Sequence, residues 1–149
     1  MKYPYAKHNI SEEDIASVVD VLKHKNITQG YKVEEFELEL AKYLDAKYVI
    51  ACSSGTAALH LIYLSMGLNE NAAIITTPIT FLATAHAARL TGAKVHFADV
   101  DKYTGLILED SVRAILKNKK NKIKALVLVH LGSKTCDLEK YKKIAKDYN

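Results

Sequence analysis

The chain has 149 residues, of which 49% are hydrophobic and 26% are charged, and its formal net charge is +4. With only six glycines and two prolines, a collagen-like or linker-dominated chain is excluded. No apolar run approaches the roughly 20 residues that a membrane-spanning helix requires, and the N-terminus lacks the apolar stretch and cleavage site of a signal peptide. These features predict one globular domain in the cytoplasm, with no membrane partner.

The positive charge is concentrated near the C-terminus. Residues 1–113 carry 11 basic and 14 acidic side chains, a balance of −3, whereas residues 114–149 carry ten lysines and three acids, a balance of +7. An RNA-binding domain is one hypothesis for the lysine run, which comprises Lys117, Lys119, Lys120, Lys122 and Lys124. This run has no arginine and no interleaved aromatic residue, which nucleic-acid surfaces usually carry. A solvated helix end is therefore favoured, and no nucleic-acid partner is expected.

Cysteine and histidine spacing excludes the common metal and redox motifs. Cys52 and Cys136 lie 84 positions apart, so a disulfide scaffold and a CxxC motif are both excluded. Both side chains are expected to be buried as small apolar groups. The six histidines form neither an HExxH motif nor an i,i+4 pair, so no metal site is expected.

The first 46 residues predict an N-terminal arm followed by two helices. Residues 1–10 form the arm, and a helix starts at Ser11, because acidic residues fill its first turn and stabilise the helix dipole. The apolar face of this helix consists of Ile15, Val18, Val19 and Leu22. Residues 26–30 read as a loop. A second helix follows, with apolar side chains at four-residue spacing at Phe36, Leu40 and Leu44.

From residue 47 onward, short apolar runs alternate with amphipathic helices. Strands are predicted over 47–52, 72–76, 94–100 and 123–129, and helices over 56–66, 81–91, 109–118 and 137–148. Gly67 and Gly92 follow the first two of these helices, where a left-handed C-terminal residue is common. The alternation over 47–149 predicts an α/β fold with a mostly parallel sheet and flanking helices.

In such sheets, ligands bind in the loops that follow the carboxyl ends of the strands. The first such loop contains Ser54, Gly55 and Thr56 at the start of a helix. Helix N-termini bind phosphate through unpaired backbone N–H groups, and glycine lets the backbone approach an anion closely. The alternative is simple N-capping of the helix by Ser53 or Ser54, and both interpretations are open.

The second and third loops offer an aromatic residue and two titratable groups. Phe81 sits at or just inside a predicted helix start, where it either stacks on a flat heteroaromatic ring or fills the core, with equal weight. In the third loop, His130 is expected to be structural, and Lys134 is an improbable nucleophile in a flexible loop. Asp99 and Asp101 are expected to shape a turn rather than to form a catalytic carboxylate pair.

Several segments, taken together and in this order, resemble the DegT/StrS family of pyridoxal-phosphate (PLP) sugar aminotransferases. They are ITQG (27–30), FE (36–37), SSGTAAL (53–59), TTPITFLATAHA (76–87), GAKVHFADVD (92–101) and VLVHLGSKTCDLEK (127–140). The similarity covers nearly the whole chain. The TTPITF and ITQG segments are most similar to transaminases that make 4-amino-4,6-dideoxy sugars on UDP for pseudaminic acid synthesis.

The resemblance implies an incomplete large domain of the fold-type I aminotransferases, with residues 1–149 as its N-terminal part. It implies that PLP is the cofactor, that Phe81 stacks on its pyridine ring, and that backbone amides hold its phosphate at Ser54, Gly55, Thr56 and Ala57. It also implies that the sugar nucleotide is bound with the help of Thr28, Gln29 and Gly30.

The implied reaction transfers an amino group, typically from glutamate, to a nucleotide-linked keto-sugar. Such enzymes act as homodimers in surface-polysaccharide or amino-sugar biosynthesis. The family's acidic partner of the pyridine nitrogen and its Schiff-base lysine lie downstream of the last matched segment. No catalytic residue is therefore expected in this chain, which is expected to be truncated and inactive alone. Two alternatives are a shortened non-catalytic paralogue that binds a full-length subunit, and a fragment of a PLP-dependent sugar dehydratase.

The resemblance also implies an order of strands in the sheet. Residues 47–52 would lie at one edge, and 72–76 would pair with 94–100 at the other. Strands beyond residue 149 would separate this pair from 123–129. In that order 47–52 would have no neighbouring strand within the chain, and its backbone groups would need other partners.

Overall fold

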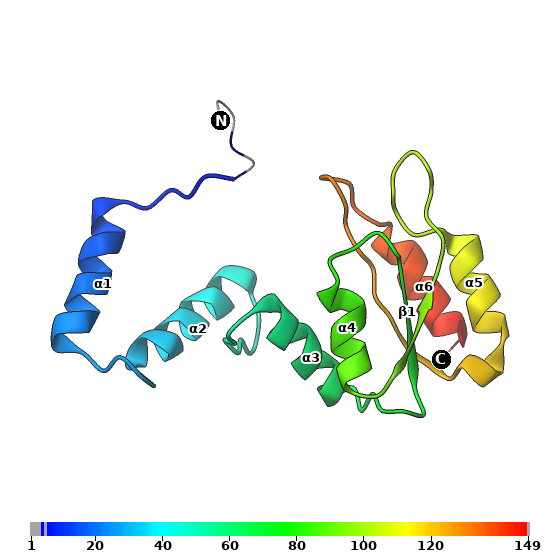
Figure 1. Cartoon of the computed structure of the whole chain (residues 1–149), viewed down its shortest axis with the longest axis horizontal. Helices are drawn as coiled ribbons and strands as arrows, with labels where there is room; N and C mark the ends of the chain where they lie inside the picture. The colour runs from blue at the N-terminus through cyan, green and yellow to red at the C-terminus, as the bar shows by residue number, and fades with distance from the viewer. Residues whose placement is uncertain (1–3, 5, 149) are drawn as a thin grey trace. The chain divides into compact units, whose positions relative to one another are not determined.

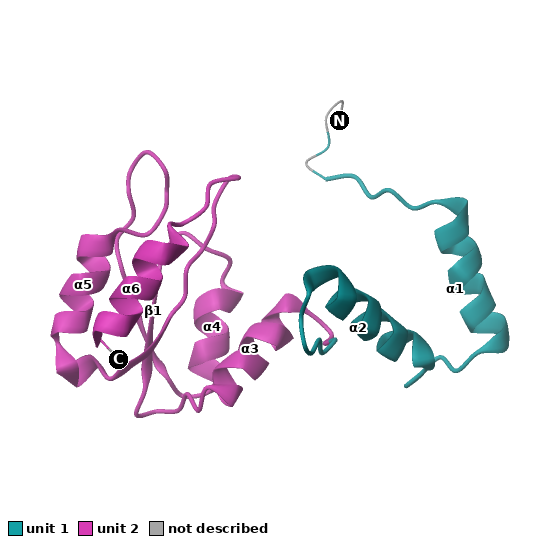
Figure 2. Cartoon of the chain, turned by 180° about the vertical axis from the view of Figure 1, so that it is seen from behind, with its two compact units in different colours: residues 1–51 teal, residues 52–149 magenta. Residues whose placement is uncertain are grey.

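The computed structural model describes residue 4 and residues 6–148. Residues Met1–Ala51 and Cys52–Asn149 form two compact units (Figure 2). Four residues of the predicted N-terminal arm, 1–3 and 5, lie outside the described residues, and Ala6–Ile10 belong to no helix or strand. Within the described residues, every helix falls short of the length and apolar content needed to cross a membrane.

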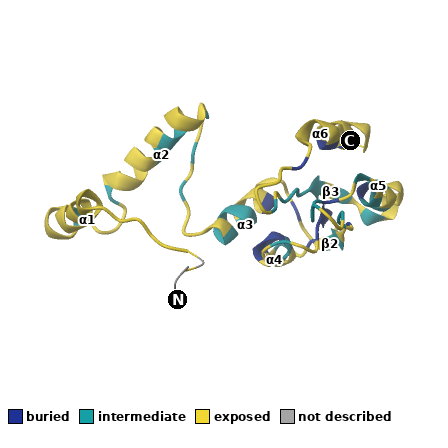
Figure 3. Cartoon of the chain, turned by 90° about the horizontal axis from the view of Figure 1, so that it is seen from above, coloured by how far each residue is buried: buried dark blue, intermediate teal, exposed yellow. Residues whose placement is uncertain are grey.

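The first unit contains helices α1 (Glu12–His24) and α2 (Tyr31–Leu44). Ser11 caps α1: its Oγ accepts a hydrogen bond from the Asp14 N–H at 3.2 Å, and Asp14 Oδ2 accepts one from the Ser11 N–H at 2.8 Å. This confirms the predicted start of the first helix. The predicted apolar face of α1 is present but not buried, and neither α1 nor α2 buries a residue (Figure 3).

The strand predicted over 47–52 is wrong. These residues form no strand, and Tyr48 and Ile50 expose their side chains. The Ala51 N–H instead donates to the carboxylate of Glu37, with an N to Oε1 distance of 2.6 Å. The apolar, β-branched sequence favours an extended backbone, but a strand also needs a neighbouring strand to complete its hydrogen bonds. Within the described residues, no strand pairs with this segment.

The second unit is built on a parallel sheet of β1 (Ala73–Thr76), β2 (Lys94–Phe97) and β3 (Ile123–Leu126). The strand order is β2-β1-β3, and Ile75 on the central strand pairs with His96 on one side and Leu126 on the other. This confirms the α/β class with a parallel sheet. The predicted separation of 123–129 from 72–76 is wrong, because β3 lies directly beside β1.

Helices cover both faces of this sheet. Ile74 packs on one face with side chains of α3 (Gly55–Ser65) and α4 (Ala83–Leu90). Ile75 packs on the other with side chains of α5 (Glu109–Lys117) and α6 (Leu138–Tyr148). A 3₁₀ turn, Lys119–Asn121, lies between α5 and β3. The continuous burial of β1 explains why its sequence is an unbroken apolar run rather than an alternating one.

Helices α4, α5 and α6 begin at the end of the sheet where the strands finish (Figure 1). The two glycines predicted to follow helices do so in the left-handed conformation, with φ of +69° at Gly67 and +87° at Gly92. At Gly92 a Cβ atom would also lie only 3.2 Å from the backbone nitrogen of Glu70. The second and third loops that the sequence singled out therefore lie at the carboxyl edge of the sheet. The first, residues 52–56, leads into α3 but follows no strand within the described residues.

Candidate functional site

The N-terminus of α3 is the first part of the candidate site. Ser54 is its N-cap residue, and the Ser54 Oγ accepts a hydrogen bond from the Ala57 N–H at 3.1 Å. The Ser54 carbonyl accepts from the Ala58 N–H at 3.0 Å. The capping alternative is thus observed, with Ser54 rather than Ser53 as the cap. Capping engages the Ala57 amide, so the first-turn N–H groups of Gly55 and Thr56 are those without an intrahelical acceptor.

Gly55 gives this helix end an open approach. A Cβ atom added at Gly55 would meet no other atom within 4 Å. The Cβ position of Gly55 is therefore open, and the partial positive charge of an 11-residue helix lies at this end. The hydroxyl of Thr56 belongs to the same turn.

Phe81 is the second part of the site, in the loop between β1 and α4. The helix begins at Ala83, two residues later than predicted, so Phe81 lies just before it rather than at its start. Phe81 is 79% exposed. The core-filling alternative is therefore wrong for this unit. A large exposed aromatic ring at the carboxyl edge of a parallel sheet is available to stack on a flat ligand.

Three residues that support the loop of Phe81 were not identified from the sequence: Thr80, Thr84 and Tyr63. The Thr80 and Thr84 Oγ1 atoms lie 2.9 Å apart, and the hydroxyl of buried Tyr63 donates to the Thr84 carbonyl at 3.0 Å. The sequence feature that could have pointed to the threonines is their density around Phe81: residues 76–84 contain four threonines. Threonine in a strand-to-helix loop commonly bonds to nearby polar groups.

The third loop is held by a contact within it and by a contact with the loop that follows β2. His130 Nδ1 accepts a hydrogen bond from the Cys136 N–H at 3.1 Å, which gives this histidine a structural role. The Lys134 Nζ donates to the Tyr103 carbonyl at 3.1 Å and is exposed to solvent. A desolvated nucleophilic lysine is not found at this position.

Asp101 shapes a turn, as predicted. Its Oδ1 accepts from the Tyr103 N–H, the Thr104 N–H and the Thr104 hydroxyl, at 3.0, 2.8 and 2.9 Å. The bonds from Thr104 lower the pKa of Asp101, with smaller contributions from the Tyr103 amide and the charge of Lys134. Asp99 Oδ1 similarly accepts from the Val100 N–H at 2.8 Å. Both carboxylates therefore accept hydrogen bonds from residues within three positions in the chain.

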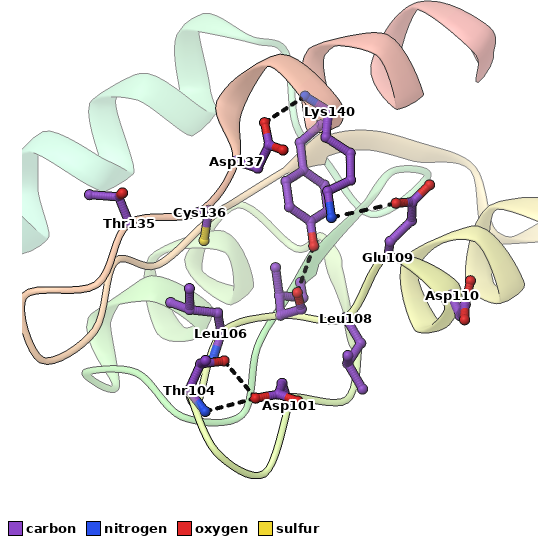
Figure 4. Close-up of a pocket in the computed structure, with 12 residues that line it drawn as sticks. Asp101, Thr104, Leu106, Leu108, Glu109, Asp110, Thr135, Cys136, Asp137 and Lys140 are labelled. Atoms are coloured by element: carbon purple, nitrogen blue, oxygen red, sulfur yellow. Dashed lines mark hydrogen bonds and ion pairs between the residues drawn. The ribbon is translucent and has the colours of Figure 1, made fainter.

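A cavity of about 440 Å³ lies between the loops that follow β2 and β3 (Figure 4). Glu109, which lines it, pairs with Arg113 at 2.7 Å and with Lys140 at 3.6 Å. The bond from Arg113 lowers the pKa of Glu109, and Lys140 adds to the effect. The Asp137 Oδ1 accepts from the Lys140 N–H at 3.1 Å. Glu109 and Asp137 therefore serve the junction of α5 and α6 that lines this cavity.

The predicted sugar-nucleotide residues belong to the first unit, in the loop between α1 and α2. Gln29 adopts a left-handed backbone with φ of +51°. Gly30 is the N-cap residue of α2, and a Cβ atom there would lie 2.7 Å from the Asn26 carbonyl oxygen. The close approach explains why this loop ends in glycine. Thr28 and Gln29 are exposed, and their role in binding stays a prediction.

The two cysteines differ in environment. Cys136 is buried and burial raises the pKa of its thiol, but Cys52 is exposed, so the expected burial of Cys52 is wrong. The Cys52 Sγ lies 3.4 Å from the Ser54 carbonyl oxygen, immediately before α3. Within residue 4 and residues 6–148, no three His, Cys, Asp or Glu side chains are grouped to hold a metal ion.

The chain is similar to known aminotransferases in sequence and in structure. A curated UDP-4-amino-4,6-dideoxy-N-acetyl-beta-L-altrosamine transaminase of Campylobacter jejuni is 39% identical over 145 residues, which cover 97% of this chain and 38% of that protein. The solved structure of Helicobacter pylori PseC, an aminotransferase involved in the biosynthesis of pseudoaminic acid, matches 98% of this chain and 39% of its own with a TM-score of 0.83 and 30% identity.

A third relative is known with cofactor bound. The PLP-form of the putative sugar aminotransferase Spr1654 from Streptococcus pneumoniae matches 95% of this chain and 36% of its own, with a TM-score of 0.87 and 27% identity. The chain thus spans less than two-fifths of the length of these relatives. The family model described as the DegT/DnrJ/EryC1/StrS aminotransferase family matches residues 8–149. The motifs, the parallel α/β fold and this match together show that the chain belongs to the DegT/DnrJ/EryC1/StrS aminotransferase family.

Proposed function

We propose that residues 52–149 hold the phosphate and the ring of PLP in a sugar aminotransferase. One observation carries the proposal: one compact unit holds both a helix N-terminus that is open at Gly55 and, in the loop after β1, the exposed ring of Phe81. The family match supports PLP rather than another phosphorylated aromatic ligand.

The phosphate is proposed to accept hydrogen bonds from the Gly55 and Thr56 amides, with the Ser54 and Thr56 hydroxyls beside them. The dipole of α3 adds to this attraction because the phosphate is anionic. The ring of Phe81 is proposed to cover one face of the pyridine ring and to exclude water from it. When bound, PLP supplies the electron sink that amino transfer requires.

The substrates are proposed from the family and its relatives. We propose that an amino group passes from an amino acid, typically glutamate, to a nucleotide-linked keto-sugar, as the names of the sugar transaminases among the relatives suggest. Thr28, Gln29 and Gly30 are proposed to contact the sugar nucleotide. Residues 1–149 are proposed to correspond to the N-terminal part of the PLP-binding large domain, with 1–46 as its arm and two helices. The homodimer and the cytoplasmic location stay predictions.

No lysine of this chain is proposed to bind PLP covalently. Lys134, in the third loop, is exposed and bonded to the Tyr103 carbonyl, and the matched motifs place no lysine at the family's catalytic position. Borohydride reduction in the presence of PLP is therefore expected to label no single lysine stoichiometrically. Stoichiometric labelling of one lysine, located by peptide mapping, would contradict this assignment.

Calorimetric binding of pyridoxamine 5′-phosphate tests the cofactor site. This probe has no aldehyde, so it does not react with the chain's many lysines. We expect binding that weakens by at least about tenfold for pyridoxamine, which lacks the phosphate, because the charged hydrogen bonds at α3 are lost. Phe81→Ala is expected to weaken binding by about tenfold through loss of ring stacking.

The matched control is Phe36→Ala, which removes another exposed phenylalanine ring, in α2. It is expected to leave the affinity within about twofold of the unchanged chain. Equal binding of pyridoxamine and its phosphate would rule out the proposed phosphate site, and an unchanged affinity in Phe81→Ala would rule out stacking. A PLP-dependent dehydratase would share these contacts, so the experiment tests the cofactor site and not the subsequent reaction.

A further inference from the structure

We infer that Thr84 and Tyr63 position Phe81 for the cofactor ring by fixing its backbone to helix α3. The inference rests on the proposed function, since it concerns how the proposed ring-stacking residue is held. Neither Thr84 nor Tyr63 is proposed to touch the cofactor, so both are positioning residues.

An exposed aromatic ring is not located by core packing. Phe81 is 79% exposed, so few neighbouring side chains restrict its ring. Its position must therefore follow from its backbone. The Thr84 N–H donates to the Phe81 carbonyl at 3.0 Å, and the Thr84 Oγ1 lies 2.9 Å from the Oγ1 of Thr80, the residue before Phe81. Thr84 thus holds the chain on both sides of the Phe81 α-carbon.

Thr84 is itself anchored to the neighbouring helix. The Tyr63 hydroxyl on α3 donates to the Thr84 carbonyl at 3.0 Å, and Tyr63 is only 2% exposed. Burial raises the pKa of Tyr63, so its hydroxyl remains a donor at neutral pH. Thr84 therefore uses its amide, its side chain and its carbonyl in three separate contacts.

Close packing of α3 against α4 lets the Tyr63 hydroxyl reach the Thr84 carbonyl. Ala87 and Ala88 on α4 are fully buried beside Tyr63 in one core cluster, and their small side chains allow the helices to approach closely. Tyr63 follows Gly55 by eight residues on the same helix, a rise of about 12 Å. The helix whose first turn is proposed to hold the phosphate is thereby linked rigidly to the loop that carries the ring-binding residue.

Thr84→Val tests the inference, because valine keeps the shape of threonine and replaces its hydroxyl with a methyl group. We expect the affinity for pyridoxamine 5′-phosphate to fall by about fivefold, the effect of one hydrogen bond. Thr84→Ser restores the hydroxyl and is expected to restore the affinity. The matched control is Thr91→Val, at the other end of α4, which removes the 2.8 Å bond from Thr91 Oγ1 to the Ala88 carbonyl. Its affinity is expected to stay within about twofold of the unchanged chain.

A double-mutant cycle with Phe81→Ala separates positioning from general destabilisation. If Thr84 acts through Phe81, Thr84→Val is expected to have no further effect on affinity once the Phe81 ring is absent. Tyr63→Phe is expected to behave in the same way, and in the ligand-free chain to speed hydrogen exchange at the Thr84 amide by about fivefold. Both predictions apply to variants that retain cooperative unfolding.

The outcomes of this cycle separate the inference from the proposed function. A fivefold loss from Thr84→Val that persists in the Phe81→Ala background overturns the positioning role alone. The positioning role is also overturned if Thr84→Val and Thr91→Val bind pyridoxamine 5′-phosphate with equal affinity. If the unchanged chain does not bind the probe, or if Phe81→Ala binds normally, the proposed function fails and the inference fails with it.

Discussion

Replacing Ile75 by alanine is expected to lower the free energy of unfolding by about 3 to 4 kcal/mol. Ile75 has no exposed surface and lies at the centre of β1, with strands on both sides. Its side chain packs against Val112 of α5 and Ile144 of α6 in the core on that face of the sheet. Truncation would leave a cavity that rigid neighbours on three elements cannot close. Urea denaturation followed by circular dichroism measures the change.

Ile62→Ala is the matched control for this truncation. Ile62 is 52% exposed on α3, and alanine favours helix, so the same change is expected to alter the free energy of unfolding by less than about 1 kcal/mol. A loss of similar size in both variants would show that Ile75 does not occupy a closed core in solution. The three-stranded sheet would then be packed differently from the structure described.

Raising the pH from 10 to 12 is expected to remove about 2 kcal/mol of stability through Tyr141 alone. Burial, with smaller contributions from Cys136 and nearby carboxylates, raises the pKa of Tyr141 to about 12, from 10.0 in an exposed tyrosine. Its hydroxyl also donates to the Ile107 carbonyl at 2.6 Å. The folded chain thus keeps a proton that the unfolded chain releases, so stability is full below pH 10 and falls as the pH rises toward 12.

Comparison with Tyr141→Phe isolates this contribution from the titration of lysines in the same range. The variant is expected to lose about 1 kcal/mol at pH 7, because the Ile107 carbonyl loses its donor, but to show a shallower decline between pH 10 and 12. Tyr103→Phe removes the hydroxyl of an exposed ring and is expected to keep the decline of the unchanged chain. Parallel pH profiles for Tyr141→Phe and the unchanged chain would contradict the buried, proton-retaining state of Tyr141.

Local sequence signals predicted most helices and three of the four expected strands. Ser11 and its acidic neighbours predicted the start of α1, and Gly67 and Gly92 predicted two helix ends, because capping and left-handed residues depend on the immediate neighbours. The segment 47–52 has an equally good strand sequence but forms no strand. Strand formation depends on partners distant in sequence, and local pattern carries no information about them.

The order of the strands in the sheet also could not be predicted from the local sequence pattern. The resemblance led to the expectation that other strands separate 72–76 from 123–129, yet Ile75 pairs directly with Leu126. Parallel neighbours are joined by long crossovers, so chain order does not determine which strands are adjacent. The register emerges only when the apolar faces of β1 pack against helices on both sides of the sheet.

The sequence identified the main residues of the candidate site but not the contacts that support them. Gly55 and Phe81 were identified from the loop position and from the family motifs, and the structure leaves both accessible. The link from Tyr63 to Thr84 joins residues 21 positions apart on different helices. A hydrogen bond to a backbone carbonyl places no constraint on residue type at the acceptor, so this contact has no signature in the residue pattern.

Amide chemical-shift mapping with pyridoxamine 5′-phosphate tests the proposed cofactor site most directly. Backbone signals are recorded by nuclear magnetic resonance as the probe is added, first to the unchanged chain and then to Phe81→Ala. The proposed site predicts the largest shifts at the Gly55 and Thr56 amides and a ring-current shift at Phe81. Largest shifts in the lysine-rich segment 117–124, with Gly55 and Thr56 unmoved, would contradict it.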